Sequence, residues 1–205
     1  MMKKLPEWES HVSRETILKL EQYDALLHKW QKAINLISSK TLGDSWNRHF
    51  VDSMQILPLI DEKCSKALDL GCGAGFSGVV TAICKPEIEM HLAESDTKKC
   101  NFMAAVSRET KIPVKVHNIR IEKLGGDSYD LITARALCSL VMLFDYSYRF
   151  VEVNPELIFV FHKGERFQQE IDDARRKYSF DVDIYQSITD DRGCVLKVSA
   201  LKKLD

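Results

Sequence analysis

The sequence predicts an α/β fold, in which a mostly parallel sheet is covered by helices on both faces and preceded by a helical extension. From residue 66 onward, short apolar runs alternate with longer amphipathic stretches, a pattern typical of strand–helix–strand units. Before residue 66, apolar residues recur with helical spacing and no strand pattern appears. A glycine-rich stretch, ALDLGCGAGFSG, joins the first predicted strand to the helix after it. The length of 205 residues fits one such domain with its extension.

The extension contains two predicted helices. In residues 16–38, apolar side chains recur three and four positions apart, which predicts an amphipathic helix. These apolar positions are Ile17, Leu20, Tyr23, Leu27, Trp30 and Ile34. A second helix is predicted over residues 46–57, capped by Asp44 or Ser45 and stopped by Pro58.

Seven strands and four helices are predicted in the remainder of the chain. The strands are residues 66–70, 89–93, 114–117, 130–133, 157–161, 181–185 and 195–200. The helices between the first six strands are residues 75–83, 97–110, 139–150 and 165–177. No linker rich in proline, glycine or serine separates residue 60 from residue 66. We therefore expect residues 1–62 to form an extension packed on a domain of residues 63–205.

The composition describes a chain of balanced charge. The formal net charge is -1, whereas strong nonspecific nucleic-acid binders are usually basic, so a local patch would have to hold any RNA partner. No apolar run approaches the length of a membrane span, and no apolar segment follows the N-terminal lysines. We therefore expect a cytoplasmic protein without membrane association. The six cysteines and six histidines lack metal-ligand spacing, so we predict reduced thiols and no metal site.

The glycine-rich stretch has two interpretations. Gly73, Gly75 and Gly78 match the GxGxxG pattern of dinucleotide-binding loops. Alternatively, Asp69 precedes glycines at positions 71, 73 and 75, which gives the pattern DxGxGxG. A carboxylate at that place would repel a pyrophosphate but suits a cofactor with cationic groups, such as the ammonium and sulfonium of S-adenosylmethionine. A tight turn without a ligand is the plainer alternative.

An acid ends the next predicted strand. Glu94 lies 23 residues after Gly71, where a carboxylate can accept hydrogen bonds from both ribose hydroxyls of a bound nucleoside. NAD and S-adenosylmethionine share this feature, so Glu94 indicates a nucleoside without choosing between the two. A solvated loop acid is the alternative.

The order of five segments carries a more specific signal. RHFVDSM, LDLGCGAGFSGVV, ESDTKKCNFM, ITARALCSL and FHKG follow one another along the chain. This order resembles the class I S-adenosylmethionine-dependent methyltransferases and, more narrowly, the glucose-inhibited division protein B family of bacterial 16S ribosomal RNA guanine-N7 methyltransferases. The resemblance implies a Rossmann-like, seven-stranded, mostly parallel sheet whose last two strands form a pair. The chain departs from the family at Ala74 and Ser77 (usually prolines), at Glu94 (usually aspartate) and at Ala134 (usually serine).

The resemblance also implies roles for individual residues. The cofactor-binding residues it implies are Gly71, Gly73, Phe76, Glu94, Ile121, Glu122 and Arg135. The RNA-binding candidates near the site are Arg48, His49 and Lys163. Further basic candidates for RNA contact are Lys98, Lys99, Arg120, Arg166, Arg175 and Arg176. We predict no catalytic acid or base, because guanine N7 carries an exposed lone pair and needs no deprotonation.

Several of these residues have plainer interpretations. Phe76 is typical of a core aromatic, and Glu122 of a surface acid. Arg48 and Asp52 are four positions apart, which predicts an intrahelical ion pair. Lys163 either contacts RNA phosphate or caps the edge of the sheet.

The sequence thus predicts a monomeric enzyme that methylates guanine N7 in 16S ribosomal RNA, free or in a small-subunit assembly intermediate. A first alternative is a methyltransferase of the same fold acting on a small molecule or a protein. An NAD-dependent oxidoreductase is less favoured, because it needs a second domain that the chain is too short to supply. A noncatalytic RNA-binding protein is disfavoured by the intact glycines and acid.

Overall fold

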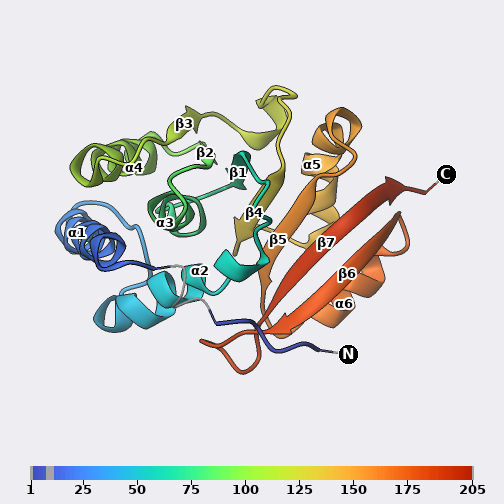
Figure 1. The fold of residues 1–205 in the computed structure, drawn as a ribbon, viewed down its shortest axis with the longest axis horizontal. Coiled ribbons are helices and arrows are strands. Elements are labelled where there is room, and N and C mark those ends of the chain that lie inside the picture. Colours follow the sequence, from blue (N-terminus) through green and yellow to red (C-terminus); the bar gives the residue numbers. More distant parts are fainter. Residues whose placement is uncertain (1, 8–11, 205) are drawn as a thin grey trace.

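The computed structural model describes residues 2–7 and 12–204. Its centre is a seven-stranded sheet with the order β3-β2-β1-β4-β5-β7-β6 (Figure 1). Strands β1 to β5 run parallel, and β7 runs antiparallel to both of its neighbours. The strands are β1 (Lys66–Leu70), β2 (Glu89–Glu94), β3 (Lys115–Asn118), β4 (Leu131–Arg135), β5 (Ile158–Lys163), β6 (Tyr178–Gln186) and β7 (Cys194–Lys203). This confirms the predicted mostly parallel sheet with its paired last strands.

All seven predicted strands are present, and β6 and β7 differ most from the prediction. They are longer at both ends because they pair with each other from Tyr178 opposite Lys203 to Gln186 opposite Cys194. Such a two-stranded ribbon is held by its own ladder of hydrogen bonds, so it extends beyond the apolar residues that marked it in the sequence.

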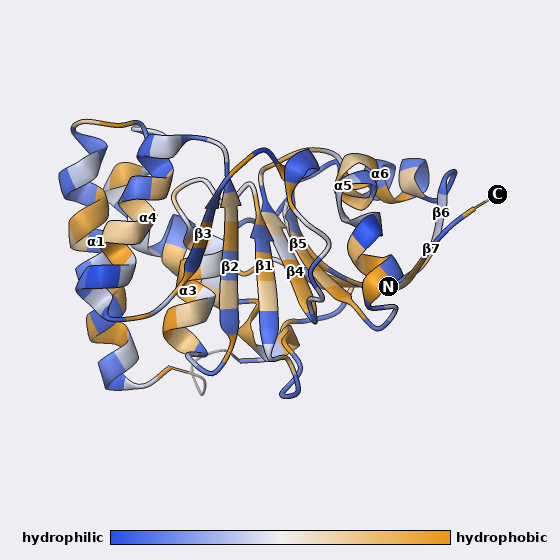
Figure 2. Cartoon of the chain, turned by 90° about the horizontal axis from the view of Figure 1, so that it is seen from above, coloured by the Kyte–Doolittle hydropathy of each residue, from blue (hydrophilic) through white to orange (hydrophobic). Residues whose placement is uncertain are grey.

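Two helical layers cover the sheet (Figures 1 and 2). On one face lie α1 (Arg14–Gln31), α3 (Phe76–Cys84) and α4 (Thr97–Thr110), and on the other lie α5 (Leu140–Val153) and α6 (Phe167–Ala174). Alternating residues of one strand serve the two cores, since Ala67 of β1 packs in the first and Leu68 in the second. Figure 2 shows the resulting apolar interior on both sides of the sheet.

The sheet order fixes where a ligand can bind. Strand β1 lies between β2 and β4, so the chain leaves it toward one side and later returns on the other. At such a reversal the loops after the two strands separate and leave a crevice at the carboxyl ends. The glycine loop follows β1 directly and therefore borders this crevice.

The predicted second helix of the extension is wrong in detail. In place of one helix over residues 46–57, the chain forms a π-helical turn, Trp46–Val51, then a short α-helix, Asp52–Met54 (α2). Neither predicted cap acts as one: Ser45 Oγ donates to Asp24 Oδ1 at 2.8 Å, and Asp44 Oδ1 accepts from the Asn47 side chain. Pro58 does not stop a helix but lies in a separate 3-10 turn, Leu57–Leu59, where the missing N–H of proline is tolerated.

The extension contacts the rest of the chain through aromatic side chains. Tyr23 of α1 stacks on Phe76 of α3 with ring centroids 5.7 Å apart, and it meets Phe50 edge-on at 5.0 Å. Its hydroxyl donates to the Ala74 carbonyl inside the glycine loop. The extension therefore packs directly against the glycine loop and the start of α3.

Within the described residues, no helix has the length and apolar character needed to cross a bilayer. The same part of the chain contains no cluster of three or more His, Cys, Asp or Glu side chains arranged to hold a metal ion. All six cysteines are free thiols.

Candidate active site

The glycine loop adopts a backbone that favours the DxGxGxG interpretation. Gly71, Gly73 and Gly75 have φ angles of 58°, 59° and 89°, in the left-handed region that side chains disfavour. A Cβ on Gly71 would also lie 2.4 Å from Leu137 Cδ1. Gly78, the last glycine of the GxGxxG match, has another function: its absent Cβ lets α3 pack against Leu92 and Asp69. The three left-handed glycines thus follow Asp69 at every second position, as in the DxGxGxG pattern.

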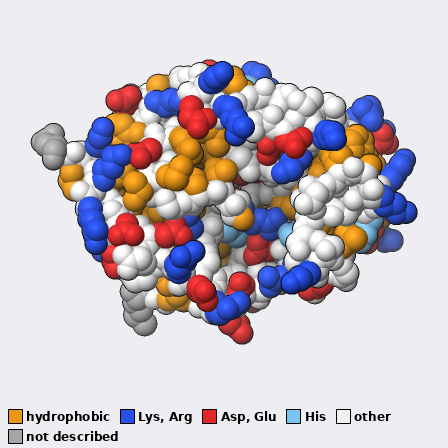
Figure 3. Space-filling view, turned by 180° about the vertical axis from the view of Figure 1, so that it is seen from behind, with side chains coloured by type: hydrophobic (Ala, Val, Ile, Leu, Met, Phe, Trp, Pro, Cys, Tyr) orange, Lys and Arg blue, Asp and Glu red, His pale blue; other side chains and the backbone are white. Residues whose placement is uncertain are grey.

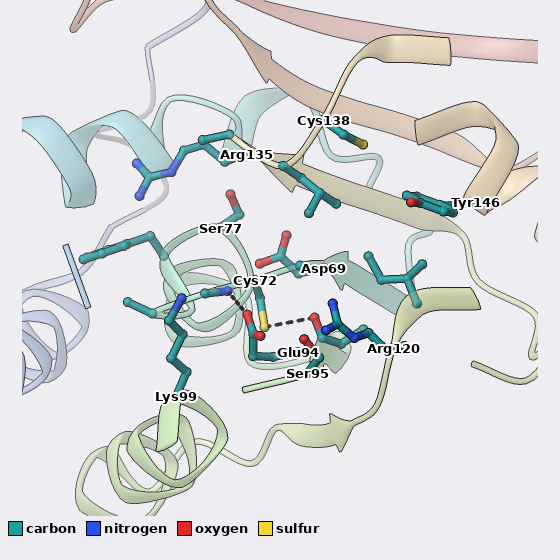
Figure 4. A pocket seen from close by; sticks show the side chains of 18 of the residues that line it. Asp69, Cys72, Ser77, Glu94, Ser95, Lys99, Arg120, Arg135, Cys138 and Tyr146 are labelled. Carbon is teal, nitrogen blue, oxygen red and sulfur yellow. Dashed lines mark hydrogen bonds between the residues drawn. The ribbon is translucent and has the colours of Figure 1, made fainter. Parts of the chain in front are cut away.

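Asp69 is buried beneath this loop and is 1% exposed. Its Oδ2 accepts from the Gly78 N–H at 2.9 Å, and its Oδ1 accepts from the Thr133 hydroxyl at 2.8 Å. Burial raises the pKa of Asp69 to about 7, although these two donors oppose the shift. The carboxyl also lines the cavity above the loop (Figure 4). Because a nearby cation stabilises its ionised form, Asp69 favours a positively charged ligand.

Cofactor affinity should therefore depend on pH. A cationic cofactor binds the ionised form of Asp69 better, so affinity should rise with pH and level off above about 7. At one pH unit below that value, we expect binding about tenfold weaker than the plateau. Calorimetric titration from pH 5.5 to 8.5 measures this. The isosteric Asp69→Asn variant should bind weakly at every pH, and an equal slope in this variant would contradict the assignment.

Glu94 lies at the end of β2 beside the loop. Its Oε2 accepts from the Gly73 N–H at 3.0 Å, and its Oε1 accepts from the Asp96 N–H at 2.8 Å. These bonds fix the carboxylate while leaving further lone pairs on both oxygens. Figure 4 shows Glu94 directed into the cavity, as a ribose-binding acid requires.

One cavity of about 550 Å³ joins these groups. This volume is typical of a small-molecule site. Its lining includes all seven expected cofactor residues, Gly71, Gly73, Phe76, Glu94, Ile121, Glu122 and Arg135. The sequence did not indicate Leu36 and Ile37, which add an apolar wall from the extension. The amide of Gln31 holds this wall by accepting from both backbone N–H groups and donating to the Ile37 carbonyl at 2.8 Å.

Another residue missed from the sequence fixes the opposite end of the cavity. Ile121 and Glu122 belong to a 3-10 turn after β3, and the guanidinium of Arg149 donates to both of their carbonyls. Arg149 comes from the middle of α5, where it resembles any partly exposed helical arginine. No local signal in the sequence connects it with the turn 27 or 28 residues before it.

Arg135 joins the sheet to the extension. Its Nη1 donates to Asp52 Oδ2 at 2.9 Å, and its Nη2 donates to His49 Nδ1 at 3.2 Å. Burial opposes ionisation of Asp52, but His162 and Arg135 together hold the pKa of this carboxyl below its usual value. The expected ion pair between Arg48 and Asp52 is wrong, because Arg48 donates instead to the Thr189 carbonyl at 3.2 Å. The π-helical turn redirects Asp52 toward Arg135.

His49 and Phe76 form the floor beside Arg135. The two rings stack with centroids 4.5 Å apart, and the Arg135 guanidinium lies 5.0 Å from the Phe76 centroid. Burial, and then the charge of Arg135, lower the pKa of His49 to about 4, so the ring is neutral near pH 7. With Nδ1 accepting from Arg135, Nε2 carries the proton and donates to Thr41 Oγ1 at 3.0 Å. Phe76 is thus both a core aromatic and part of the cavity lining.

Lys163 has its hydrogen-bond partners within the fold. Its side chain is 6% exposed, and its ammonium donates to Glu170 Oε2 at 2.6 Å and to the Cys138 carbonyl at 2.7 Å. The structure supports the alternative, in which Lys163 caps the sheet edge. Sequence reasoning could not decide this, because the partner acid lies on α6.

The other basic candidates divide into two groups. Lys99 and Arg120 line the cavity, whereas Lys98, Arg166, Arg175 and Arg176 do not. Arg176 pairs with Asp173 at 3.6 Å, and Arg175 lies over the Phe180 ring. On the face shown in Figure 3, basic side chains alternate with acidic ones and form no single basic patch.

Solved structures similar to this fold include methyltransferases. The ribosomal protein L11 methylase from Lactobacillus delbrueckii subsp. bulgaricus matches with a TM-score of 0.58, over 75% of this chain and 78% of that one, at 14% identity. Magnesium protoporphyrin IX methyltransferase (ChlM) from Synechocystis PCC 6803 matches with a TM-score of 0.54, over 91% and 97%, at 12% identity. At such identities the likeness shows the fold alone, and it confirms the class I methyltransferase fold.

Sequence relatives are much closer. Ribosomal RNA small subunit methyltransferase G from Parvibaculum lavamentivorans is 44% identical over 197 residues, which cover 94% of this chain and 86% of the relative. The protein of the same name from Rhodospirillum centenum is 42% identical over 190 residues, with 93% and 87% covered. The family model GidB, described as rRNA small subunit methyltransferase G, matches residues 16–193. The chain therefore belongs to the GidB family of rRNA small subunit methyltransferases.

Proposed function

We propose that this protein transfers the methyl group of S-adenosylmethionine to N7 of a guanine in small-subunit ribosomal RNA. The observation that carries the proposal is the meeting of two features at one cavity. The glycine loop and Glu94 form the cofactor side of the cavity. The RHFVD segment contributes His49 and Asp52, which both accept hydrogen bonds from Arg135 in the cavity lining. Membership of the GidB family supports ribosomal RNA as the substrate.

The residues present fit S-adenosylmethionine. Asp69 suits its cationic groups, Glu94 its ribose hydroxyls, and the turn of Ile121 and Glu122 its adenine. When bound, this cofactor supplies an electrophilic methyl group. The pyrophosphate of NAD fits less well, because it would lie above the carboxyl group of Asp69, which would repel it when ionised. The chain after β4 also completes the same sheet, so the described residues contain no separate substrate domain.

Methylation of N7 makes modest chemical demands on the protein. The N7 lone pair attacks without prior deprotonation, so the enzyme has to align the two groups and exclude water. His49 suits this role as a positioning residue, because both of its ring nitrogens are engaged within the fold. Arg135 places a fixed positive charge at the cavity wall, where it can attract the cofactor carboxylate.

The RNA contacts and the assembly state complete the proposal. We place Lys99 and Arg120 at the rim of the cofactor cavity and Arg48 at a smaller cavity beside Arg135, where all three would bind phosphates. We assign Lys163 to support of the sheet edge. We propose that the enzyme acts as a monomer on RNA or on a small-subunit assembly intermediate.

Transfer of labelled methyl groups tests the function. Wild-type protein with labelled S-adenosylmethionine should label unmodified small-subunit ribosomal RNA at one guanine, which digestion and mass spectrometry would map. The Glu94→Ala variant should bind the cofactor about tenfold to a hundredfold more weakly, because hydrogen bonds to a charged acceptor are lost. Normal cofactor binding by the wild type without label in the RNA would contradict the proposal and favour a small-molecule or protein acceptor.

A further inference from the structure

A second cavity lies directly beside the cofactor cavity and has a volume of about 480 Å³. Both cavities are lined by three consecutive residues of the loop after β4, Ala136, Leu137 and Cys138. From there the second cavity continues along the end of β5 and the side of α6 that carries Gln169 and Glu170. Figure 4 shows Cys138 across the cofactor cavity from Glu94, so the second cavity begins on the side away from the ribose acid.

The shared wall is closely coupled to the cofactor loop. Leu137 packs on Gly71 so tightly that a Cβ on this glycine would be 2.4 Å from its Cδ1. Ala136 has a φ of 52°, in the left-handed region that alanine rarely adopts and that is often found at ligand sites. The second cavity therefore adjoins the cofactor cavity at this short loop.

The polar groups of the second cavity are suited to a hydrogen-bond donor and an anion. Glu170 Oε2 accepts from Lys163 and from the Leu140 N–H, whereas Glu170 Oε1 accepts no hydrogen bond from the described residues. Its carboxylate is thus oriented by one oxygen and available through the other. Arg166, at the start of α6, is exposed and makes no ion pair within residues 2–7 and 12–204. It offers a guanidinium at the mouth.

Guanine matches this arrangement. Its N1–H and 2-amino groups are donors on the edge opposite N7, so a base with N7 toward the cofactor turns these donors away from it. We propose that the second cavity receives the target guanine, flipped out of its strand, with Glu170 Oε1 accepting from the Watson–Crick edge and Arg166 binding an adjacent phosphate. This inference rests on the proposed function, and it assigns Lys163 the task of orienting Glu170.

Two adjacent glutamines of α6 provide a matched test. Both are exposed, and each donates to an acid four residues on, Gln168 to Asp172 and Gln169 to Asp173. Only Gln169 lines the cavity. Gln169→Trp should lower kcat/KM for RNA at least about tenfold by filling the cavity, with an unchanged cofactor Kd. Gln168→Trp should match the wild type in both, and equal activity of the two variants would overturn the proposal.

The RNA itself provides a second test, whose first comparison uses the wild-type enzyme alone. Inosine retains N7 and lacks only the 2-amino group, so a ligated transcript with inosine at the mapped guanine probes the Watson–Crick edge. We expect kcat/KM to fall about tenfold or more with wild-type enzyme, since a hydrogen bond to a charged acceptor is lost. In Glu170→Gln the ratio between the guanosine and inosine transcripts should fall toward one. Equal methylation of both transcripts by the wild type would overturn the role of Glu170.

The experiments distinguish failure of the proposed function from failure of the cavity assignment. If the wild type leaves the guanosine transcript unlabelled, the proposed function itself fails. If the wild type labels it but neither Gln169→Trp nor inosine matters, the function stands and the assignment of the cavity fails.

Discussion

Replacement of Arg135 by alanine should abolish most methyl transfer and destabilise the protein. The side chains of Arg135 and Asp52 are only 19% and 16% exposed, so removal of the guanidinium leaves a carboxylate without its counter-charge inside the fold. Loss of one partner from such a pair typically costs about 3–5 kcal/mol. Urea unfolding measures the stability, and labelled methyl transfer measures the activity. The fraction of activity that the variant loses should exceed the fraction of its molecules that are unfolded, because the cavity of the folded molecules also lacks its fixed positive charge.

A surface pair provides the control for this prediction. Arg176 pairs with Asp173, but its side chain is 78% exposed, so Arg176→Ala should cost less than about 1 kcal/mol. The double variant Arg135→Ala with Asp52→Asn should recover part of the lost stability, because the unpaired charge is removed. If Arg135→Ala and Arg176→Ala unfolded at the same urea concentration, the Asp52–Arg135 pair would have no special structural role.

Replacement of Gly78 by alanine should damage both the fold and the cofactor site. An added Cβ would lie 2.2 Å from Leu92 Cδ2 and 2.9 Å from Asp69 Cβ, inside a fully packed region. Overpacking of this kind costs about 1–3 kcal/mol. It also pushes α3 away from Asp69, so cofactor affinity should fall with stability. Thermal unfolding with and without S-adenosylmethionine measures both effects.

Substitutions of two other glycines distinguish overpacking from left-handed backbone strain as the cause of the expected loss of stability. Gly73→Ala introduces a side chain at a φ of 59° without a close contact, so it should cost only the left-handed strain of about 1–2 kcal/mol. Gly43→Ala faces open space and should change stability by less than about 0.5 kcal/mol. If Gly78→Ala proved as mild as Gly43→Ala, close packing of α3 on β1 would not be what requires this glycine.

The helix–strand pattern was sufficient for the sheet and its layers, because parallel strands buried on both faces form continuous apolar runs. It was insufficient for the second helix of the extension. The π-helical turn of Trp46–Val51 is stabilised by contacts of Asp52 and His49 with Arg135, which lies more than 80 residues later in the chain. Helical periodicity alone cannot contain that information.

The residues of the candidate site likewise fall into those that a local sequence pattern predicts and those that only the tertiary structure reveals. Local backbone requirements made the glycine loop and Glu94 recognisable, since left-handed glycines and a strand-end acid have to occur at fixed spacing. Arg149 and Gln31 carry no such local mark, because each acts by hydrogen bonds to a distant or irregular backbone segment. Lys163 was ambiguous because its exposure depends on Glu170 of a different element.

The sequence by itself therefore determined the α/β class, the position of the cofactor loop and the family resemblance, because each depends on local patterns or on the order of such patterns along the chain. The tertiary structure decided which partners the charged residues take. It paired Asp52 with Arg135, buried Lys163 against Glu170 and placed a second cavity beside the cofactor cavity at the loop of Ala136. The physical reason is that a charge or hydrogen-bonding group is satisfied by whatever lies nearest in space, and folding brings together residues that no local pattern connects.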